Sequence, residues 1–571
     1  MQKNLNKRMR NILLKSFLGF LLLIESFSLI AQTSIHCDYE IDAEDKYIIN
    51  PSYLPGDTVC IMPGLRGSLY LKEVIGLPDY PIVIINKGGQ VIIDSDLDPE
   101  SKYGIKFVES KNFVLSGAGD QNYTYGILLR DVPSGSGLSL ESKSSDFEID
   151  HIEISNIDNS GIVAKTDPDC SYTAVRDSFQ MSNIKIHDNY IHDTGNEGMY
   201  IGSSFFLGQY IADCDTTLLP HIIDGVEIYN NRVEFTGWDA IQVGSALFNC
   251  TIHDNYIYSD SQAEEPFQMS GIRINAGSSC HVFNNKIING KGTGIFNHGT
   301  GGQKIFNNLI VNAGYDYDFD NKSTKKIHGI FSKYAYIYPA DSTYHFYNNT
   351  IINPKNDGIR IMNSQAKNNR IINNLIINPG AYDYYENLGS TEVSADDAYI
   401  HNYLNENTLY SINNILERSS KNQFFADTIR NDYHLTTLSP AVNWGFDLSS
   451  YGIAFDLENK QRPFEYYFDI GAYELQLITP IVTLQNHNQE IKLFPNPAND
   501  FFHLSFYIDK SQTLSLKFVS LGGKEFFLEQ NTYFAKGNNK KTLSIKKLPK
   551  GEYILMLYNK DIQFIQKILK L

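Results

Sequence analysis

Three sets of residues, repeated through the middle of the chain, are of types that act on sugars or bind metal ions. One set lies within six short apolar segments that begin with Gly or Ala, such as Gly198–Ile201 and Gly271–Ile274, and the other two sets lie just before and just after these segments. Because alternate side chains of a strand point to opposite faces, we expect the residue between two apolar ones to face outward. This outward set is Tyr200, Gln242, Arg273, Phe296, Phe331 and Arg360. Two positions further on are Gly202, Gly244, Asn275, His298, Lys333 and Met362, and the preceding corner carries Glu197, Asp239, Ser270, Thr293, His328 and Asp357.

These residue types fit the chemistry of an acidic polysaccharide. Aromatic rings stack on pyranose rings, and guanidinium groups bind carboxylates. In elimination from a uronate, a cation or an arginine neutralises the carboxylate, and a base then takes the proton α to it. We predict that Arg273, His298 and Lys333 supply the neutralising group and the base. The predicted substrate-binding residues are Tyr200, Gln242, Asn275 and Arg360.

The carboxylates of Glu197 and Asp239 occupy equivalent corners, one repeat apart. Carboxylate oxygens suit Ca²⁺, so this pair is a predicted metal site. Paired carboxylates also catalyse glycoside hydrolysis, and a polar corner that satisfies turn amides explains the same residues without any chemistry. The sequence therefore leaves three functions open. They are a uronate polysaccharide lyase, which we favour slightly, a glycoside hydrolase, and a non-catalytic glycan-binding adhesin.

A second motif repeats between these segments and indicates the fold that positions them. It consists of an apolar residue, any residue, Asp or Asn, then Asn, any residue and apolar residues. The second Asn occurs at Asn189, Asn231, Asn255, Asn285, Asn308, Asn349, Asn374 and, less cleanly, Asn414. The shorter intervals cluster near 24 residues, the length of one coil of three short strands and their corners. We expect this Asn to take the positive-φ corner and its amide to hydrogen-bond along the stack.

The longer intervals contain insertions near Ser203–His221, Tyr315–Lys326 and Tyr382–Tyr403, all rich in aromatic residues. Loops on a rigid solenoid usually carry function, so we expect these insertions to wall a groove beside the outward-facing residues. Aromatic side chains that merely cap the solenoid wall would give the same pattern.

Six cysteines are too few for a disulfide-built scaffold. Cys250 and Cys280 occupy the same place in consecutive coils with both side chains inward, and we expect a buried reduced pair rather than a disulfide. The sequence leaves the pairing of the others open, with Cys37–Cys60 and Cys170–Cys214 as the candidates.

Composition and charge exclude several classes of protein. The 571 residues include 53 Asn and carry a net charge of −17, but residues 1–31 and 490–571 are basic, so residues 32–489 carry −27. This acidity excludes general nucleic-acid binding. It also argues mildly against bulk capture of a polyanion, although Ca²⁺ would invert the charge locally. No later apolar stretch approaches 18 residues, so we predict no transmembrane segment in the mature chain.

We predict an all-β protein, a right-handed parallel β-helix solenoid followed by a small C-terminal β-sandwich. The expected parts are an export signal at 1–31, the solenoid at 32–475, a linker at 476–489 and the sandwich at 490–571. The signal has basic residues before an apolar stretch, and the sandwich has short alternating runs separated by turn residues.

The last part resembles the C-terminal sorting domain of the type IX secretion system. The matching residues are Lys492–Asp500, Gly522 with Lys524, Gly551–Tyr553 and Gln566–Leu571. The resemblance implies that residues 490–571 engage the type IX secretion machinery. It also implies removal of the domain and a mature protein that is secreted or held at the outer-membrane surface.

The middle part resembles the pectate-lyase-like β-helix superfamily. The resemblance rests on Pro55–Val59, Val91–Asp94, Gly104–Phe107, Tyr125–Ile127 and the closing segments Leu438–Ala441 and Asp469–Glu474. It implies a fold and a polysaccharide partner but no single chemistry, because the superfamily includes lyases, hydrolases, epimerases and adhesins.

Overall fold

The computed structural model describes residues 35–316, 326–333, 343–363, 366–380, 398–402, 409–418, 424–464, 467–476, 492–520, 525–559 and 563–570. The chain divides into two compact units, one ending at Leu475 and the other beginning at Gln476. The predicted export signal, the Gly522 and Lys524 motif and most of the two later insertions lie outside the described residues. Within the described ranges, no helix is both long and apolar enough to cross a bilayer.

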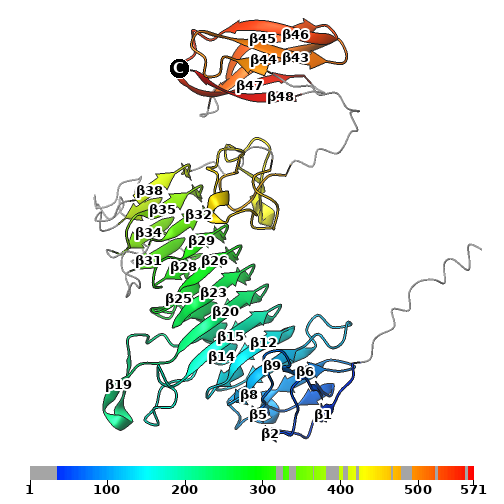
Figure 1. Cartoon of the computed structure of the whole chain (residues 1–571), viewed down its shortest axis with the longest axis vertical. Coiled ribbons are helices and arrows are strands. Elements are labelled where there is room, and N and C mark those ends of the chain that lie inside the picture. Colours follow the sequence, from blue (N-terminus) through cyan, green and yellow to red (C-terminus); the bar gives the residue numbers. More distant parts are fainter. Residues whose placement is uncertain are drawn as a thin grey trace, which may run out of the picture. The chain divides into compact units, whose positions relative to one another are not determined.

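Three long parallel sheets build the first unit, and successive coils add strands to them in turn (Figure 1). Sheet A contains β1 (Tyr39–Ile41), β3 (Thr58–Ile61), β6 (Ile82–Asn86), β9 (Lys111–Ser116), β12 (Ser145–Asp150), β15 (Gln180–His187), β20 (Ile222–Tyr229), β23 (Ala246–His253), β26 (Cys280–Phe283), β29 (Lys304–Phe306), β32 (His345–Tyr347), β35 (Asn369–Ile372) and β38 (Leu409–Ile412).

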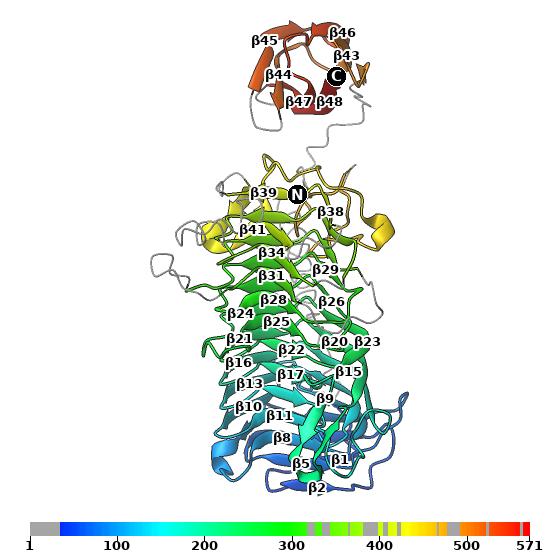
Figure 2. The ribbon, with the colours of Figure 1, turned by 90° about the vertical axis from the view of Figure 1, so that its left-hand side faces the viewer.

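Sheet B, which carries the predicted site residues, contains β2 (Tyr47–Ile49), β5 (Leu69–Lys72), β8 (Tyr103–Val108), β11 (Ser136–Glu141), β14 (Ile162–Ala164), β17 (Met199–Ile201), β22 (Ile241–Val243), β25 (Ser270–Ile274), β28 (Thr293–Asn297), β31 (Ile330–Lys333), β34 (Ile359–Met362) and β37 (Ile400–Asn402). Figure 2 shows these strands stacked between those of the other two sheets.

Sheet C contains β4 (Gly64–Arg66), β7 (Val91–Asp94), β10 (Ile127–Val132), β13 (Ile152–Ile157), β16 (Tyr190–Thr194), β21 (Arg232–Thr236), β24 (Tyr256–Tyr258), β27 (Lys286–Ile288), β30 (Leu309–Val311), β33 (Thr350–Ile352), β36 (Leu375–Ile377) and β39 (Ile415–Glu417). Shorter elements of this unit are η1 (Ser95–Leu97), β18 (Gln209–Ile211), η2 (Ala212–Cys214), β19 (Thr216–Leu218), β40 (Phe425–Asp427), η3 (Thr428–Arg430), β41 (Asp432–Leu435) and η4 (Ser449–Tyr451).

The core of the solenoid is built from apolar side chains stacked in columns. Within sheet B, for example, Ile241 lies opposite Ile272, which in turn lies opposite Ile295, and all three are fully buried. One apolar residue per strand thus repeats its position from coil to coil, and burying each Ile contributes on the order of 2 kcal/mol. This packing fixes which side chains of the same strands point outward.

The Asn residues of the repeated motif form a continuous ladder at the corner between sheets A and C. Asn255 Nδ2 donates to Asn285 Oδ1 at 3.0 Å, and Asn285 Nδ2 donates to Asn308 Oδ1 at 3.0 Å. The same bond links every consecutive pair from Asn189 to Asn414. The predicted ladder is therefore confirmed.

The expected backbone conformation of the ladder Asn is wrong by one residue. The positive φ belongs to the residue before it, as in Asp254 (55°) and Asn284 (55°). The ladder side chain must also donate to main-chain carbonyls, and Asn285 Nδ2 does so to Phe283 and Ile252. A left-handed residue directly before it turns the chain so that this amide points inward to those carbonyls.

All six cysteines form disulfides, as Cys37–Cys60, Cys170–Cys214 and Cys250–Cys280. The expectation of a reduced Cys250 and Cys280 is wrong. The two residues lie directly opposite each other on β23 and β26, and both are buried. Neighbouring strands bring equivalent side chains to within about 5 Å, which a disulfide can span.

The second unit consists of two antiparallel sheets, as predicted. One contains β42 (Lys492–Phe494), β43 (Phe501–Ile508) and β46 (Gly537–Ser544). The other contains β45 (Glu525–Phe534), β44 (Gln512–Ser520), β47 (Gly551–Tyr558) and β48 (Gln563–Lys570). Their inner faces share one apolar core that includes Phe502, Leu516 and Leu555.

Candidate functional site

The predicted outward residues of sheet B form one column in register. Tyr200, Gln242, Arg273, Phe296, Phe331 and Arg360 lie opposite one another in turn, and His401 continues the column on β37. The expectation that all of them face solvent is wrong. Gln242, Arg273 and Arg360 are 1%, 6% and 4% exposed. The aromatic members Tyr200, Phe296 and Phe331 are partly exposed.

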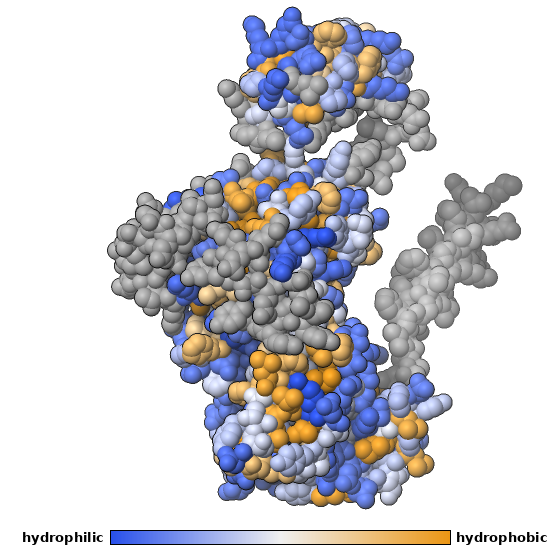
Figure 3. Space-filling model, turned by 60° about the vertical axis from the view of Figure 1, so that its left-hand side comes forward, coloured by the Kyte–Doolittle hydropathy of each residue, from blue (hydrophilic) through white to orange (hydrophobic). Residues whose placement is uncertain are grey.

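The insertion at 203–221 lies beside this column and is anchored to it. The hydroxyl of Ser204 bonds to Tyr200 Oη at 3.1 Å and accepts a hydrogen bond from Asn275 Nδ2 at 2.8 Å. The ring of Phe206 is buried, and the guanidinium of Arg176 lies 4.2 Å from its centre. Two predicted substrate-binding residues thus hold the base of the insertion. Figure 3 shows apolar side chains gathered on this side of the solenoid.

Arg273 is held in one orientation by a buried carboxylate. Its Nε donates to Asp239 Oδ2 at 2.6 Å and its Nη2 to Ser270 Oγ at 3.2 Å, while the ring of Phe296 lies 4.5 Å from the guanidinium carbon. Asp239 itself is fully buried. Among the described residues, Arg273 Nη1 makes no hydrogen bond. The guanidinium is therefore fixed on one edge and has a donor left for an anion.

His298 packs on the same Phe296 ring as this guanidinium. Its ring centre is 4.4 Å from that of Phe296, and its Nε2 has no hydrogen-bond partner. Burial, together with the charges of Arg273 and Lys333, lowers the pKa of His298 to about 3. The imidazole is therefore neutral near pH 7. Within the described part of the chain, Lys333 forms no ion pair.

The predicted metal pair is buried at the corner between sheets C and B. Glu197 is 2% exposed and accepts a hydrogen bond from Ser160 Oγ at 2.8 Å. Burial raises the pKa of Glu197 to about 7, and the carboxylate of Asp239 adds to the effect. Asp239 pairs with Arg273, and no third metal-ligating side chain among the described residues joins the two. The predicted Ca²⁺ site stays a prediction.

A second buried network surrounds Asp357, four coils along the same face. Its Oδ2 lies 2.9 Å from Arg360 Nη1, 3.2 Å from His328 Nδ1 and 3.4 Å from His401 Nδ1. Although burial opposes the effect, these groups hold the pKa of Asp357 below its usual range. Arg360, a predicted substrate-binding residue, is thus engaged by a carboxylate. The sequence reading missed His401 because the insertion near 382–403 hides its place in the column.

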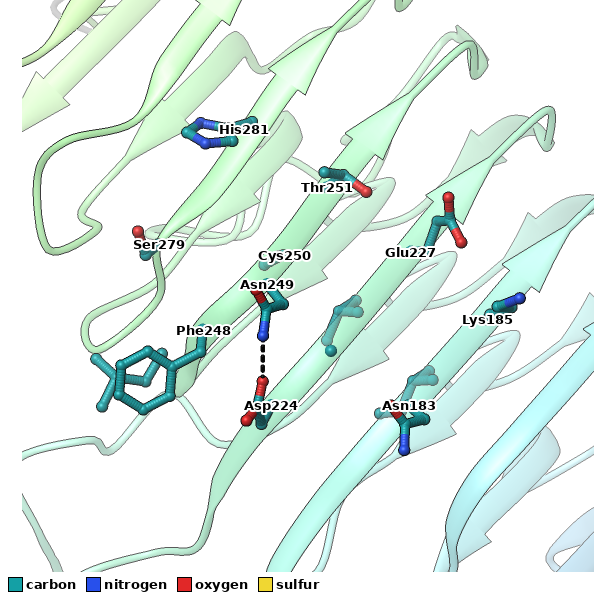
Figure 4. A pocket seen from close by; sticks show the side chains of 14 residues that line it. Asn183, Lys185, Asp224, Glu227, Phe248, Asn249, Cys250, Thr251, Ser279 and His281 are labelled. Carbon is teal, nitrogen blue, oxygen red and sulfur yellow. Dashed lines mark hydrogen bonds between the residues drawn. The ribbon is translucent and has the colours of Figure 1, made fainter. Parts of the chain in front are cut away.

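A separate hollow of about 790 Å³ lies on the outer face of sheet A (Figure 4). Its lining includes Asn183, Lys185, Asp224, Glu227, Phe248 and His281. Asn249 Nδ2 donates to Asp224 Oδ1 at 2.7 Å across its wall, as Figure 4 shows. No predicted site residue lines this hollow. The hollow was not predicted from the sequence, because the repeated chemical residue types lie on sheet B and not on sheet A.

The three stacked sheets and the Asn ladder define the protein as a parallel β-helix. The family model described as right handed beta helix region matches residues 79–312 and 208–416, which together span more than half of the chain. The chain therefore belongs to the right-handed β-helix family. A second model, the secretion system C-terminal sorting domain, matches residues 492–570, so the protein is one that the type IX system secretes to the cell surface or exterior. No curated protein matches the chain.

Proposed function

We propose that the outer face of sheet B binds an acidic extracellular polysaccharide and cleaves it by β-elimination. One observation carries the proposal. Arg273, fixed by Asp239 and with Nη1 available, packs on the same Phe296 ring as a neutral His298, whose buried Nε2 has no hydrogen-bond partner. A uronate carboxylate needs such a donor, and the carbon α to it needs such a base.

The proposed step follows from these two groups. Arg273 Nη1 and the ammonium of Lys333 bind the substrate carboxylate and neutralise its charge, which makes the α proton more acidic. His298 Nε2 takes that proton. The electron pair left on the α carbon forms a double bond to the β carbon, and the bond from the β carbon to the glycosidic oxygen breaks. The leaving oxygen takes a proton from the Tyr200 hydroxyl or from water, which gives one unsaturated and one saturated chain end.

The burial of the carboxyl groups favours this reading over hydrolysis. Glycoside hydrolases place two carboxyl groups on either side of the scissile bond. Here Glu197 and Asp239 are 2% and 0% exposed and bond to Ser160 and Arg273. Asp239 is paired with Arg273, and Glu197 Oε1, although it has no hydrogen-bond partner, is buried. Their arrangement instead supports a positioning role, in which Asp239 orients Arg273.

The test is a panel of uronate polymers and neutral glycans, each incubated with the secreted protein with and without Ca²⁺. We expect ultraviolet absorbance from an unsaturated product with at least one uronate polymer. Release of reducing ends from a neutral glycan without that absorbance would contradict the proposal and favour a hydrolase. Retention of a glycan with neither product would favour an adhesin.

A further inference from the structure

We propose that Glu148, Asp150 and His187, on the outer face of sheet A, bind a divalent transition-metal ion such as Zn²⁺. Glu148 and Asp150 are on β12, and His187 is on the neighbouring strand β15, directly opposite Asp150. One ligand atom from each residue lies within 4.8 Å of the other two. The site is separate from the face that we assign to the polysaccharide.

The spacing of these atoms fits a metal ion with few ligands. His187 Nε2 lies 3.1 Å from Glu148 Oε1. Two ligands bound tetrahedrally to zinc at its usual bond lengths are about 3.4 Å apart. A small outward shift of the Glu148 side chain, which is partly exposed, would therefore admit the ion. Three protein ligands leave at least one position for water.

The surroundings of His187 orient the ring for coordination through Nε2. Its Nδ1 lies 2.7 Å from Asp188 Oδ2, and a carboxylate on the second nitrogen is the usual support of a metal-bound histidine. His187 is 8% exposed, and its ring stacks on Tyr229 with ring centres 4.5 Å apart. Asp150, 6% exposed, accepts a hydrogen bond from Ser116 Oγ at 2.6 Å. Two of the three ligands are thus held in place before any ion binds.

The same sheet contains a natural comparison two strands further along. His253 also has an aspartate on Nδ1, Asp254 at 2.7 Å, and a glutamate near Nε2, Glu227 at 3.8 Å. The residue opposite His253 is Tyr229, where His187 has Asp150. Within the described residues, only the group around His187 brings three ligands together. Asp150 therefore supplies the third ligand, which the matching His–Asp pair at His253 lacks.

The ligand types indicate which ions the site prefers. Imidazole nitrogen favours zinc and other first-row transition metals, whereas Ca²⁺ and Mg²⁺ prefer oxygen ligands alone. We expect Zn²⁺ or Mn²⁺ to bind here and Ca²⁺ to bind at least about 10-fold more weakly.

The test is calorimetric titration of the untagged full-length chain with Zn²⁺, with Mn²⁺ and Ca²⁺ as separate titrants. The expected result is one Zn²⁺ per chain. Asp150→Asn and His187→Gln should each weaken binding by about 10-fold or more. His253→Gln, which removes the matched His–Asp pair, should leave the affinity unchanged.

Two results would overturn the proposal. They are the absence of Zn²⁺ and Mn²⁺ binding, and an affinity that Asp150→Asn and His187→Gln leave unaltered. Thermal unfolding of each variant checks that the coil is intact. If His187→Gln fails to fold, the affinity of Asp150→Asn for Zn²⁺ is the deciding measurement, because Asn has the same shape as Asp. Co²⁺ in place of Zn²⁺ gives a visible spectrum that should change in Asp150→Asn and not in His253→Gln.

Discussion

The residues that we assign to chemistry depend on buried partners that no substrate touches. The Arg273 guanidinium is held in one orientation because Asp239 accepts a hydrogen bond from its Nε, and His298 is neutral because burial and two cations disfavour its charged form. A carboxylate from a substrate would reverse part of that effect, since a nearby negative charge stabilises an imidazolium. The pKa of His298 should therefore rise when the acidic sugar binds, which makes it a stronger base.

Substitution of these two residues tests the assignment. Arg273→Lys keeps the charge but loses the paired donors, and His298→Asn removes the base. We expect each to lower kcat/KM for the uronate polymer by about 100-fold or more. His281→Asn, a change in the hollow on sheet A, should leave the rate unaltered. Loss of activity in His281→Asn with full activity in His298→Asn would move the site to sheet A.

Glu197 should make the stability of the solenoid depend on pH. Its pKa is about 7 in the folded chain, against an ordinary value of 4.5. Between these values the folded state holds a proton that the unfolded state has lost, so stability falls as pH rises from about 4.5 to 7, by at most about 3 kcal/mol. Denaturant unfolding at several pH values measures this slope. Glu197→Gln should flatten it, and equal slopes in both proteins would count against a buried, protonated Glu197.

At the scale of elements, the corners determine how the coils stack. Each ladder Asn joins two coils through its side chain and also bonds to main-chain carbonyls, so its amide replaces backbone partners that a sharp corner leaves unpaired. The period of the motif was enough to predict the coil and the ladder. The motif did not predict which residue takes the left-handed conformation, because both the ladder Asn and the Asp or Asn before it tolerate positive φ.

Removing one ladder amide should therefore be costly. Asn285→Ala deletes three donated bonds and leaves buried carbonyls unpaired, with an expected loss of about 2 to 4 kcal/mol in the free energy of unfolding. Asn353→Gly removes an exposed Asn that bonds to Asn312 and keeps its positive φ available, so it should cost less than about 1 kcal/mol. Similar losses in the two variants would show that the buried ladder has no special role.

For the whole molecule, the sequence predicted the architecture better than the site. The fold was predictable because its signals extend over many residues: the 24-residue period, the apolar columns and the sorting motif. A wrong assignment at one residue does not change the predicted architecture. The burial of Arg273 depends on contacts with Asp239 and Phe296 in neighbouring coils, which strand alternation does not include. The expected reduced state of Cys250 and Cys280 was wrong for a similar reason, because strand parity gives the direction of a side chain but not its reactivity.

Export is the property of the whole chain that can be tested directly. The sorting domain matches residues 492–570, and the type IX machinery recognises such domains at the C-terminus of its cargo. A chain that ends at Leu475 should fold but remain inside the outer membrane, as immunoblots of cell fractions and medium would show. Efficient secretion of the shortened chain would contradict a role of this domain in sorting.

The structure of the protein with a bound uronate oligosaccharide tests the central claim most directly. We predict that the sugar lies across β17, β22, β25 and β28 of sheet B, with one carboxylate on Arg273 Nη1 and the α carbon of that residue facing His298 Nε2. An oligosaccharide bound in the hollow of sheet A, or on sheet B without contact to Arg273, would contradict the account.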